Sequence, residues 1–263
     1  YSRVIAVYLS MMLSRHINSN AIGLVWNSGA EKPEHALTMR QPRIIFNHVE
    51  INPFIKVRGG LENVIKNVKN AITFASKNKV DLNVVNNSIL EYHNEQQKFD
   101  LIITDPPYAD DVQYGEMSDI FYVWIYRVLK DHYPELPSRI PLDEDFCAAP
   151  GRFGDKKLAS EFFEKGFEKS FQSINQTLND DGLLVVFFAH SNVESWNLLL
   201  NSINNSDFNV VSSYSIHTES TSNVIARNKT SFMSSIIVVC RKRTEQKTAY
   251  FEDIIPQTED NVK

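Results

Sequence analysis

The chain of 263 residues is 43% hydrophobic and 22% charged and carries a net charge of −5, which is typical of a globular protein with one large domain or two small ones. This balance excludes a polycationic chain, so any contact with nucleic acid must come from local basic patches. The two cysteines lie far apart and exclude a disulfide framework or a cysteine-based metal motif, and no apolar run reaches the roughly 18 residues of a membrane span, so we expect a reducing, cytoplasmic setting.

The first third of the chain predicts two helices separated by irregular segments. Apolar residues at helical spacing predict helices over residues 3–18 and 61–77, whereas residues 19–43 are polar and predict a loop. The apolar stretch 44–54 ends in Asn-Pro-Phe, and its Asn52 can either face a pocket or form a capped turn.

Two strands are predicted next, over residues 81–86 and 99–103, and each is followed by polar residues. The first strand leads into Asn87 and Ser88, and the second leads into the sequence Thr-Asp-Pro-Pro-Tyr at residues 104–108. Proline removes a backbone donor and fixes φ, so the two prolines end the strand in a rigid turn. In open α/β sheets this carboxyl edge is where ligands bind.

The turn carries groups that suit the binding of an aromatic amine. The carboxylate of Asp105 and the carbonyl of Pro106 can each accept a hydrogen bond from an exocyclic amine, while Tyr108 offers a face for a flat base. Acceptors on both N–H groups favour a more tetrahedral nitrogen, as methyl transfer to that nitrogen requires, and preorganised acceptors need no reorganisation during the reaction. The alternative is an ordinary Pro-Pro turn with a capping Asp.

The middle of the chain predicts a helix from Ser118 to Lys130 and a long ordered loop over residues 131–156. Tyr114 lies in the polar loop before this helix and can either contact a base or pack within the loop. Arg139 and Arg152 in the long loop can meet phosphates, so the loop is a candidate insertion for contacts to nucleic acid.

The last part of the chain predicts alternating helices and strands. Helices are predicted over residues 157–178 and 193–203, and strands over residues 183–189, 208–216 and 235–240. His190 follows the first of these strands at the carboxyl edge and can be a site residue or a structural one, while His217 follows the second. Arg227 lies in a polar loop, and residues 244–263 form a polar tail.

In combination, these motifs resemble the adenine-specific DNA methylases whose larger members contain a zinc ribbon. The resembling stretches are residues 46–54, 104–108 with 118–124, 181–190, and 216–219 with 234–236, so that the similarity covers most of residues 1–243. The resemblance implies an α/β fold with a Rossmann-like sheet whose antiparallel last strand slots between its two neighbours. It also implies S-adenosylmethionine as the methyl donor and N6 of adenine in DNA as the acceptor.

The resemblance further implies roles for single residues. It assigns catalysis to Asp105, Pro106, Pro107 and Tyr108, acting on a base that has left the stack. It places Asn87 where the family has an acid that accepts from the cofactor adenine, and we expect Ser88 and Asp105 to join Asn87 at the cofactor. The residues expected to contact the base or the DNA are Tyr108, Tyr114, His190, His217 and Arg227.

One part of the family pattern has no counterpart in these residues. The family's first strand ends in a Gly-rich turn against which the methionine moiety packs, and the sequence contains no such turn after a buried strand. The chain also begins with Tyr1 and not with Met. We therefore expect residues 1–243 to be the C-terminal part of a methyltransferase domain, completed at the cofactor site by an N-terminal segment or a separate subunit.

Two other functions are compatible with the sequence. An RNA base N-methyltransferase would use the same kind of turn, although no appended RNA-binding module is recognisable. A non-catalytic nucleic-acid-binding subunit would keep the fold without the cofactor. The leading hypothesis is a DNA adenine-N6 methyltransferase, or its catalytic half, serving a restriction or phage-defence system.

Overall fold

The computed structural model divides the chain into two compact units. It describes residues 1–21, 23–29, 31–34, 36, 37, 49, 52–56, 59–77, 82–90, 92, 98–107, 112–190, 193–217 and 234–244. The first unit comprises Tyr1–Ser88 and Pro107–Phe163, and the second comprises Ile89–Pro106 and Glu164–Lys263. Within these described ranges, no helix is both long enough and apolar enough to cross a membrane.

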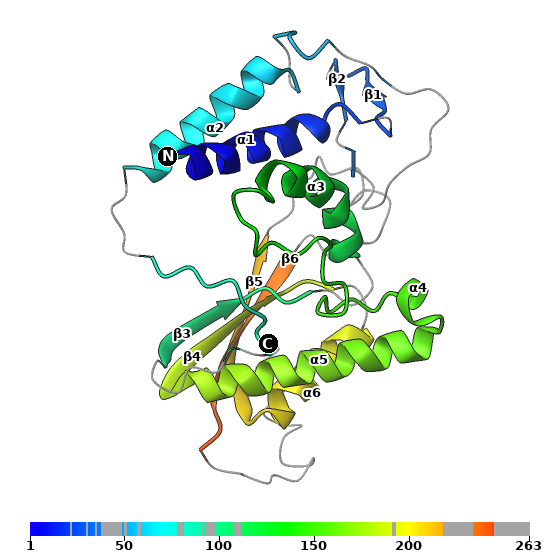
Figure 1. Cartoon of the computed structure of the whole chain (residues 1–263). Helices are drawn as coiled ribbons and strands as arrows, with labels where there is room; N and C mark the ends of the chain where they lie inside the picture. Colours follow the sequence, from blue (N-terminus) through cyan, green and yellow to red (C-terminus); the bar gives the residue numbers. More distant parts are fainter. Residues whose placement is uncertain are drawn as a thin grey trace. The chain divides into compact units, whose positions relative to one another are not determined.

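The second unit is built on a four-stranded mixed sheet (Figure 1). Its strands, in sheet order, are β3 (Phe99–Thr104), β4 (Leu178–Phe188), β6 (Ser234–Lys242) and β5 (Phe208–His217). β3 pairs parallel with β4, whereas β6 lies between β4 and β5 and runs antiparallel to both. Consequently β3, β4 and β5 all run in the same direction.

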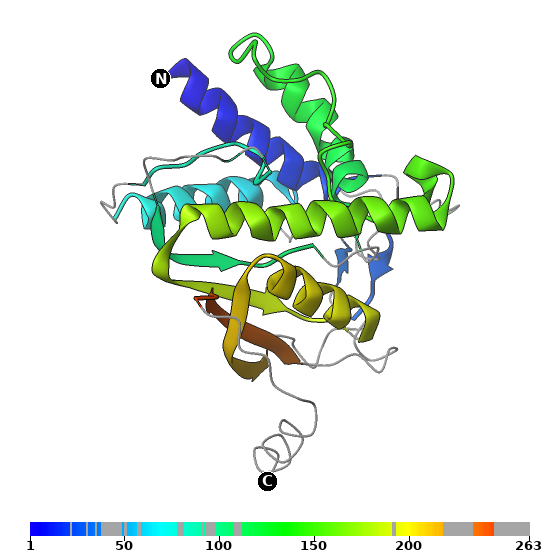
Figure 2. The ribbon, with the colours of Figure 1, turned by 90° about the horizontal axis from the view of Figure 1, so that it is seen from below.

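The core of the second unit lies on one face of this sheet. Alternate side chains of β4 are buried, as expected for a strand with one covered face, and they include Leu184, Val186 and Phe188. Helices α5 (Lys156–Thr177) and α6 (Val193–Asn205) cover this face (Figures 1 and 2). α5 begins in the first unit and continues into the second.

The first unit is mainly helical. Its elements are α1 (Ser2–Ile17), the short hairpin of β1 (Trp26–Asn27) and β2 (Lys32–Pro33), α2 (Leu61–Ala75), α3 (Tyr114–Leu129) and α4 (Pro150–Phe153). α1 contacts both α2 and α3. The buried residues of α1, Ala6 and Ser10, have small side chains, which allow a neighbouring helix to approach closely.

The four predicted helices over residues 3–18, 61–77, 157–178 and 193–203 and the predicted strands over residues 99–103, 208–216 and 235–240 are confirmed, with small shifts of their ends. Asn52 forms a capped turn, because its Oδ1 accepts the backbone N–H of Phe54 at 3.0 Å. The short hairpin β1–β2 lies within the segment predicted to be a loop.

One predicted strand is absent, and one predicted strand and one predicted helix begin earlier than expected. Residues 82–86 are not in a strand, and the side chains of Leu82 and Val84 are 75% and 87% exposed. β4 begins at Leu178, where it pairs with Phe99, and not at residue 183. α3 begins at Tyr114 and not near Ser118.

Two neighbouring leucines of α6 test the position of the core. Leu199 is fully buried, at 0% exposure, whereas Leu200 is 43% exposed. We expect Leu199→Ala to lower the free energy of unfolding by about 2–5 kcal/mol, because it removes buried methyl groups and leaves a cavity. Leu200→Ala should cost less than about 1 kcal/mol. Chemical denaturation followed by circular dichroism measures both changes, and equal losses would contradict the placement of this helix.

Candidate active site

The carboxyl ends of β3, β4 and β5 lie at one edge of the sheet in the second unit. The register pairs Thr104 of β3 with Val186 of β4, and Phe188 of β4 with Ile236 of β6. Asp105 and Pro106 directly follow β3, His190 follows β4, and His217 is the last residue of β5. We refer to this edge, with Asp105, Pro106, His190 and His217, as the carboxyl edge.

The strand ends at the carboxyl edge are spread over a distance greater than one small chemical group can bridge. The side chain of Asp105 is exposed, and Pro106 beside it is half-buried. Neighbouring strands are about 4.8 Å apart, so β5, which is three places from β3 in the sheet, lies roughly 14 Å from it. His217 and Asp105 are therefore too far apart to hold the same small group, and an extended ligand is needed to reach both strand ends.

His190 packs into an aromatic cluster at the end of β4. Its ring stacks on Phe188 with the centroids 6.3 Å apart, and Phe188 in turn meets Trp196 edge to face at 4.9 Å. The backbone oxygen of His190 accepts the indole N–H of Trp196 at 3.0 Å. These contacts give His190 a structural role, and a role in binding a substrate stays a prediction.

The opposite edge of the sheet is held together by basic residues at the end of β6. Lys242 forms an ion pair with Asp180 at 3.1 Å, and Arg241 donates to the backbone oxygen of Asp181 at 2.7 Å. Arg243 donates to the backbone oxygen of Asn204 at 2.8 Å. These cations link the end of β6 to β4 and α6, and so they stabilise the sheet. Asp105 lies at the other edge.

The remaining predicted site residues are placed as follows. Asn87 and Ser88 are exposed or half-exposed, and the amide oxygen of Asn87 accepts the N–H of Ser88 at 2.8 Å. The prediction that Asn87 and Ser88 follow a strand is wrong, because residues 82–86 form no strand. Pro107 is half-buried, whereas Tyr108 and Arg227 lie outside the described residues.

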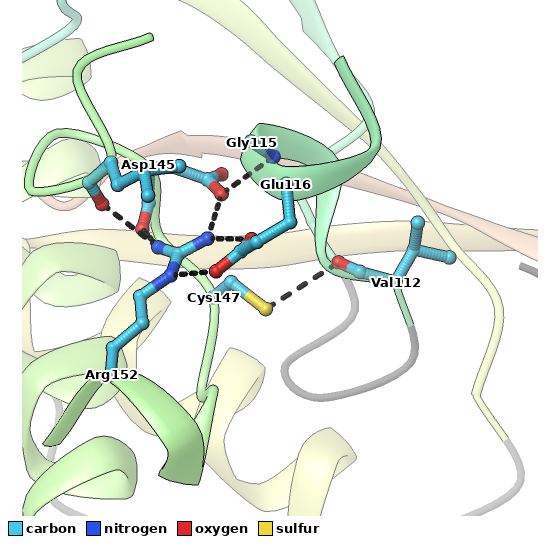
Figure 3. A network of polar contacts seen from close by, with 7 residues as sticks. Val112, Gly115, Glu116, Asp145, Cys147 and Arg152 are labelled. Carbon is cyan, nitrogen blue, oxygen red and sulfur yellow. Dashed lines mark hydrogen bonds and ion pairs between the residues drawn. The ribbon is translucent and has the colours of Figure 1, made fainter. Parts of the chain in front are cut away.

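Arg152 is the centre of a polar network in the first unit (Figure 3). Its Nε donates to Glu116 at 2.6 Å, and its Nη2 donates both to Glu116 and, at 2.6 Å, to Asp145. Its Nη1 donates to the backbone oxygens of Leu142 and Asp145, at 2.8 and 3.1 Å. These contacts use all of the N–H donors of a guanidinium. The prediction that Arg152 meets a phosphate is therefore wrong.

The hydrogen bonds of this network shift the pKa of its charged members. The hydrogen bond from Arg152 holds the pKa of Glu116 below its ordinary value, and the same bond raises the pKa of Arg152. The side chain of Arg152 is only 12% exposed. A guanidinium this buried requires partners for its charge, and Glu116 and Asp145 supply them.

Asp145 supplies the cap at the N-terminus of α3. Gln113, the residue before the helix, makes no side-chain capping bond. Instead, the Oδ2 atom of Asp145 accepts the backbone N–H of Gly115 at 3.0 Å, from thirty residues further along the chain. The first amides of a helix have no partner within the helix and favour negative charge, so Asp145 stabilises a start at Tyr114. Tyr114 consequently lies in the first turn of the helix, where it is 46% exposed.

A second contact links the long loop, residues 131–156, to the residues just before α3. Cys147 is buried, at 1% exposure, and its thiol donates to the backbone oxygen of Val112 at 3.5 Å. The predicted ordered loop over residues 131–156 is thus anchored to the chain that follows the Asp-Pro-Pro turn. The sequence does not predict the contacts of Glu116, Asp145 and Cys147, and the absence of a good capping residue at position 113 is the one local signal of an external cap.

Comparison with known proteins adds one finding. A family model for N6/N4 methyltransferases, described as DNA methylase, matches residues 99–263. No curated protein and no solved structure matches the chain.

Gly115 tests how closely the loop approaches α3. A Cβ atom at this position would lie 2.5 Å from Leu142 Cδ2 and 2.9 Å from Asp145 Oδ2, whereas a Cβ at Gly151 would meet nothing within 4 Å. We expect Gly115→Ala to lower the free energy of unfolding by about 1–3 kcal/mol through overpacking. Gly151→Ala should be neutral or slightly stabilising, because alanine favours a helix. Thermal or chemical unfolding of both variants measures these changes. A Gly115→Ala variant with the same free energy of unfolding as the wild type would contradict this packing.

The ion pair of Glu116 predicts a dependence of stability on pH. Because its folded-state pKa is lowered, Glu116 stabilises the fold above the ordinary carboxyl pKa of about 4.3 and loses this contribution as the pH falls through the lower folded-state value. We expect the wild-type protein to exceed Glu116→Gln in free energy of unfolding at pH 7 and this difference to shrink at pH 3. Glu116 is 39% exposed, so the difference should stay below about 1 kcal/mol. A difference that grows toward pH 3 would refute this assignment.

Proposed function

The chain belongs to the family of N6/N4 DNA methylases, and on this premise we propose that it is an S-adenosylmethionine-dependent DNA adenine-N6 methyltransferase, or the catalytic half of one. The family comprises enzymes that methylate an exocyclic amino group of a DNA base, so the proposal adds the choice of adenine and the residues that act on it. DNA is the partner that this activity requires.

The observation that carries the proposal is the placement of Asp105 and Pro106 at the carboxyl end of β3. Asp105 is exposed there, and its carboxylate and the carbonyl of Pro106 are the two acceptors of the proposed site. We propose that these two oxygens accept the two N–H groups of adenine N6. The nitrogen lone pair would then be less delocalised into the ring and could attack the methyl carbon of S-adenosylmethionine. The bond between this carbon and sulfur would break, S-adenosylhomocysteine would leave, and the nitrogen would lose its extra proton to solvent.

The proposal requires that the target base leaves the DNA duplex, because N6 is paired and stacked within it. In this account the ring of Tyr108 stacks on the extruded base, and Tyr114 is a second candidate for that contact. The distance between the ends of β3 and β5 supports an extended ligand such as a DNA strand. His217 at the far strand end and Arg227 beyond it are the candidates for contacts to this strand.

S-adenosylmethionine would supply the electrophilic methyl group. Asn87, Ser88 and Asp105 carry oxygen acceptors of the kind that the adenine and amino groups of this cofactor require, and we propose that they contact it. No strand in the described part of the second unit is followed by a glycine-rich turn that could hold the methionine moiety. We therefore propose that an N-terminal segment or subunit completes the cofactor site and, with it, a Rossmann-like sheet.

A role in a restriction or phage-defence system is a further part of the proposal. A methylase in such a system marks the host's own DNA at a defined sequence. Sequencing of host DNA with detection of modified bases tests this role, since it predicts N6-methyladenine at nearly every copy of one short sequence. Methylation scattered over unrelated sequences would argue against it.

Loss of Asp105 should remove most of the activity. We expect Asp105→Ala in the full-length protein to lower kcat for methyl transfer to DNA by about 10²–10³-fold, because it removes an acceptor aimed at the reacting amine. Asp181→Ala is the matched control, because Asp181 is exposed at the opposite edge of the sheet. Transfer of label from S-adenosylmethionine to DNA measures both rates.

Analysis of the labelled nucleosides separates the alternatives. The proposal predicts N6-methyladenine in DNA. Label in N4-methylcytosine would correct the target base, and label in RNA alone would favour an RNA base N-methyltransferase. No transfer to either nucleic acid by wild type and variants alike would favour a non-catalytic nucleic-acid-binding subunit.

A further inference from the structure

We propose that a cavity in the first unit binds a small phosphorylated molecule, such as a sugar phosphate or a mononucleotide. The cavity has a volume of about 400 Å³ and is bordered by the end of α1, the β1–β2 hairpin and the start of α2 (Figure 1). Small-molecule sites in proteins have volumes of roughly 300–1,000 Å³, so the space suffices for such a ligand. The cavity shares no residue with the carboxyl edge, and the proposal does not rest on the proposed function.

Hydrogen bonds hold the three walls of the cavity together. Asn18, which directly follows α1, accepts the backbone N–H of Ala36 with its side-chain oxygen at 3.1 Å and with its backbone oxygen at 2.9 Å. Asn20 donates its side-chain N–H to the backbone oxygen of Gly59 at 3.4 Å, just before α2. The cavity is therefore formed before a ligand enters, which lowers the cost of binding.

The lining of the cavity carries positive charge. Arg15 of α1 and Lys32 of β2 border it from two different elements, and no acid is among the described residues that line it. Lys32 pairs with Glu34, but the two charged atoms are 3.7 Å apart, near the outer limit of an ion pair. Arg15 lies in the last turn of α1, where its charge also suits the helix end, and it forms no ion pair within the described part of the chain. Two cations at one cavity favour an anion as its ligand.

The hydroxyl of Ser19 is a second observation that points to a ligand. Ser19 lines the cavity and is only 6% exposed, and its hydroxyl has no hydrogen-bond partner among the described residues. No polar side-chain atom of those residues is both fully enclosed and without a partner, so this hydroxyl keeps an opening, which the cavity provides. A phosphate oxygen in the cavity would accept the hydrogen bond that the hydroxyl can donate.

The start of α2 supplies further groups for hydrogen bonds. Asn63 and Asn67 line the cavity, and their spacing of four residues places them on the same face of the helix. Their amides contain both donors and acceptors, which suit the hydroxyl and ester groups of a ligand. The N-terminus of α2 adds partial positive charge, and Gly60 before it makes no side-chain cap. Glu62 in the same turn is exposed and does not line the cavity, so its charge points to another side.

The burial of one wall favours a small ligand over a nucleic-acid backbone. Ser19 is nearly buried, and only a group that enters the cavity reaches it. The phosphates of a DNA duplex lie on the outside of a stiff rod and meet exposed side chains. A small phosphate ester can enter, place its phosphate between the two cations and Ser19, and direct its hydroxyl groups to the amides of α2.

Isothermal titration calorimetry of the full-length protein at constant ionic strength tests the proposal. The probes are pyrophosphate and ribose 5-phosphate, and unphosphorylated ribose is the control ligand. We expect a Kd of about 1 mM or tighter for both phosphorylated probes and no binding of ribose. Arg15→Gln and Lys32→Gln should each raise this Kd about tenfold or more, because each removes a hydrogen bond to a charged group. Lys66→Gln is the matched control: it loses the same charge from an exposed position of α2 outside the lining, and its Kd should stay within about twofold of the wild type.

Ser19→Ala separates ligand binding from a role in the fold. Because the hydroxyl has no partner among the described residues, we expect the variant to keep the wild-type midpoint of chemical denaturation. It should nevertheless raise the Kd for ribose 5-phosphate about threefold or more, because a hydrogen bond to the phosphate is lost. A lower midpoint with an unchanged Kd would show that the hydroxyl serves the fold and would overturn its assignment to the ligand.

The remaining outcomes decide the proposal independently of methyl transfer. A wild type that binds neither phosphorylated probe overturns it, as does binding that Arg15→Gln, Lys32→Gln and Ser19→Ala all leave unchanged. If Arg15→Gln weakens the binding of a DNA duplex but not that of ribose 5-phosphate, the cavity contacts a nucleic-acid backbone and the small ligand is wrong. If Lys32→Gln does not fold, Arg15→Gln and Ser19→Ala carry the test.

Discussion

The shared direction of β3, β4 and β5 is the constraint on which the candidate site depends. Because β6 is the antiparallel member and lies between β4 and β5, the other strands all end at one edge of the sheet. Backbone pairing thus places an acid after β3, an aromatic cluster with His190 after β4, and His217 at the end of β5. The basic residues at the end of β6 form contacts with β4 and α6 at the opposite edge.

A second constraint acts on the chain that follows the Asp-Pro-Pro turn. The guanidinium of Arg152 is nearly buried, and its donors are all satisfied by Glu116, by Asp145 and by the backbone. An incompletely paired charge in such a place would be costly, so the network favours one arrangement of loop and helix. The loop over residues 131–156, predicted to contact DNA, has in its C-terminal half a structural role at the start of α3.

The features that could be predicted from the sequence are those determined by residues close to them in the chain. The apolar run of β3 and the two prolines after it define a strand and its end within a few residues. By contrast, the start of α3 at Tyr114 depends on Asp145, thirty residues away, and residues 82–86 have the apolar content of a strand but no pairing partner among the described strands. The role of Arg152 also escaped prediction, because an arginine in a loop carries no local sign of the carboxylates that will surround it.

The most direct test of the central claim is an experimental structure of the full-length protein with DNA and a non-reactive analogue of S-adenosylmethionine. We expect an adenine outside the duplex, with its N6 atom within about 3.2 Å of both the Asp105 carboxylate and the Pro106 carbonyl oxygen. A base whose amine contacts neither oxygen, or DNA bound with the Asp105 turn facing away from it, would contradict the assignment of this turn as the site of methyl transfer.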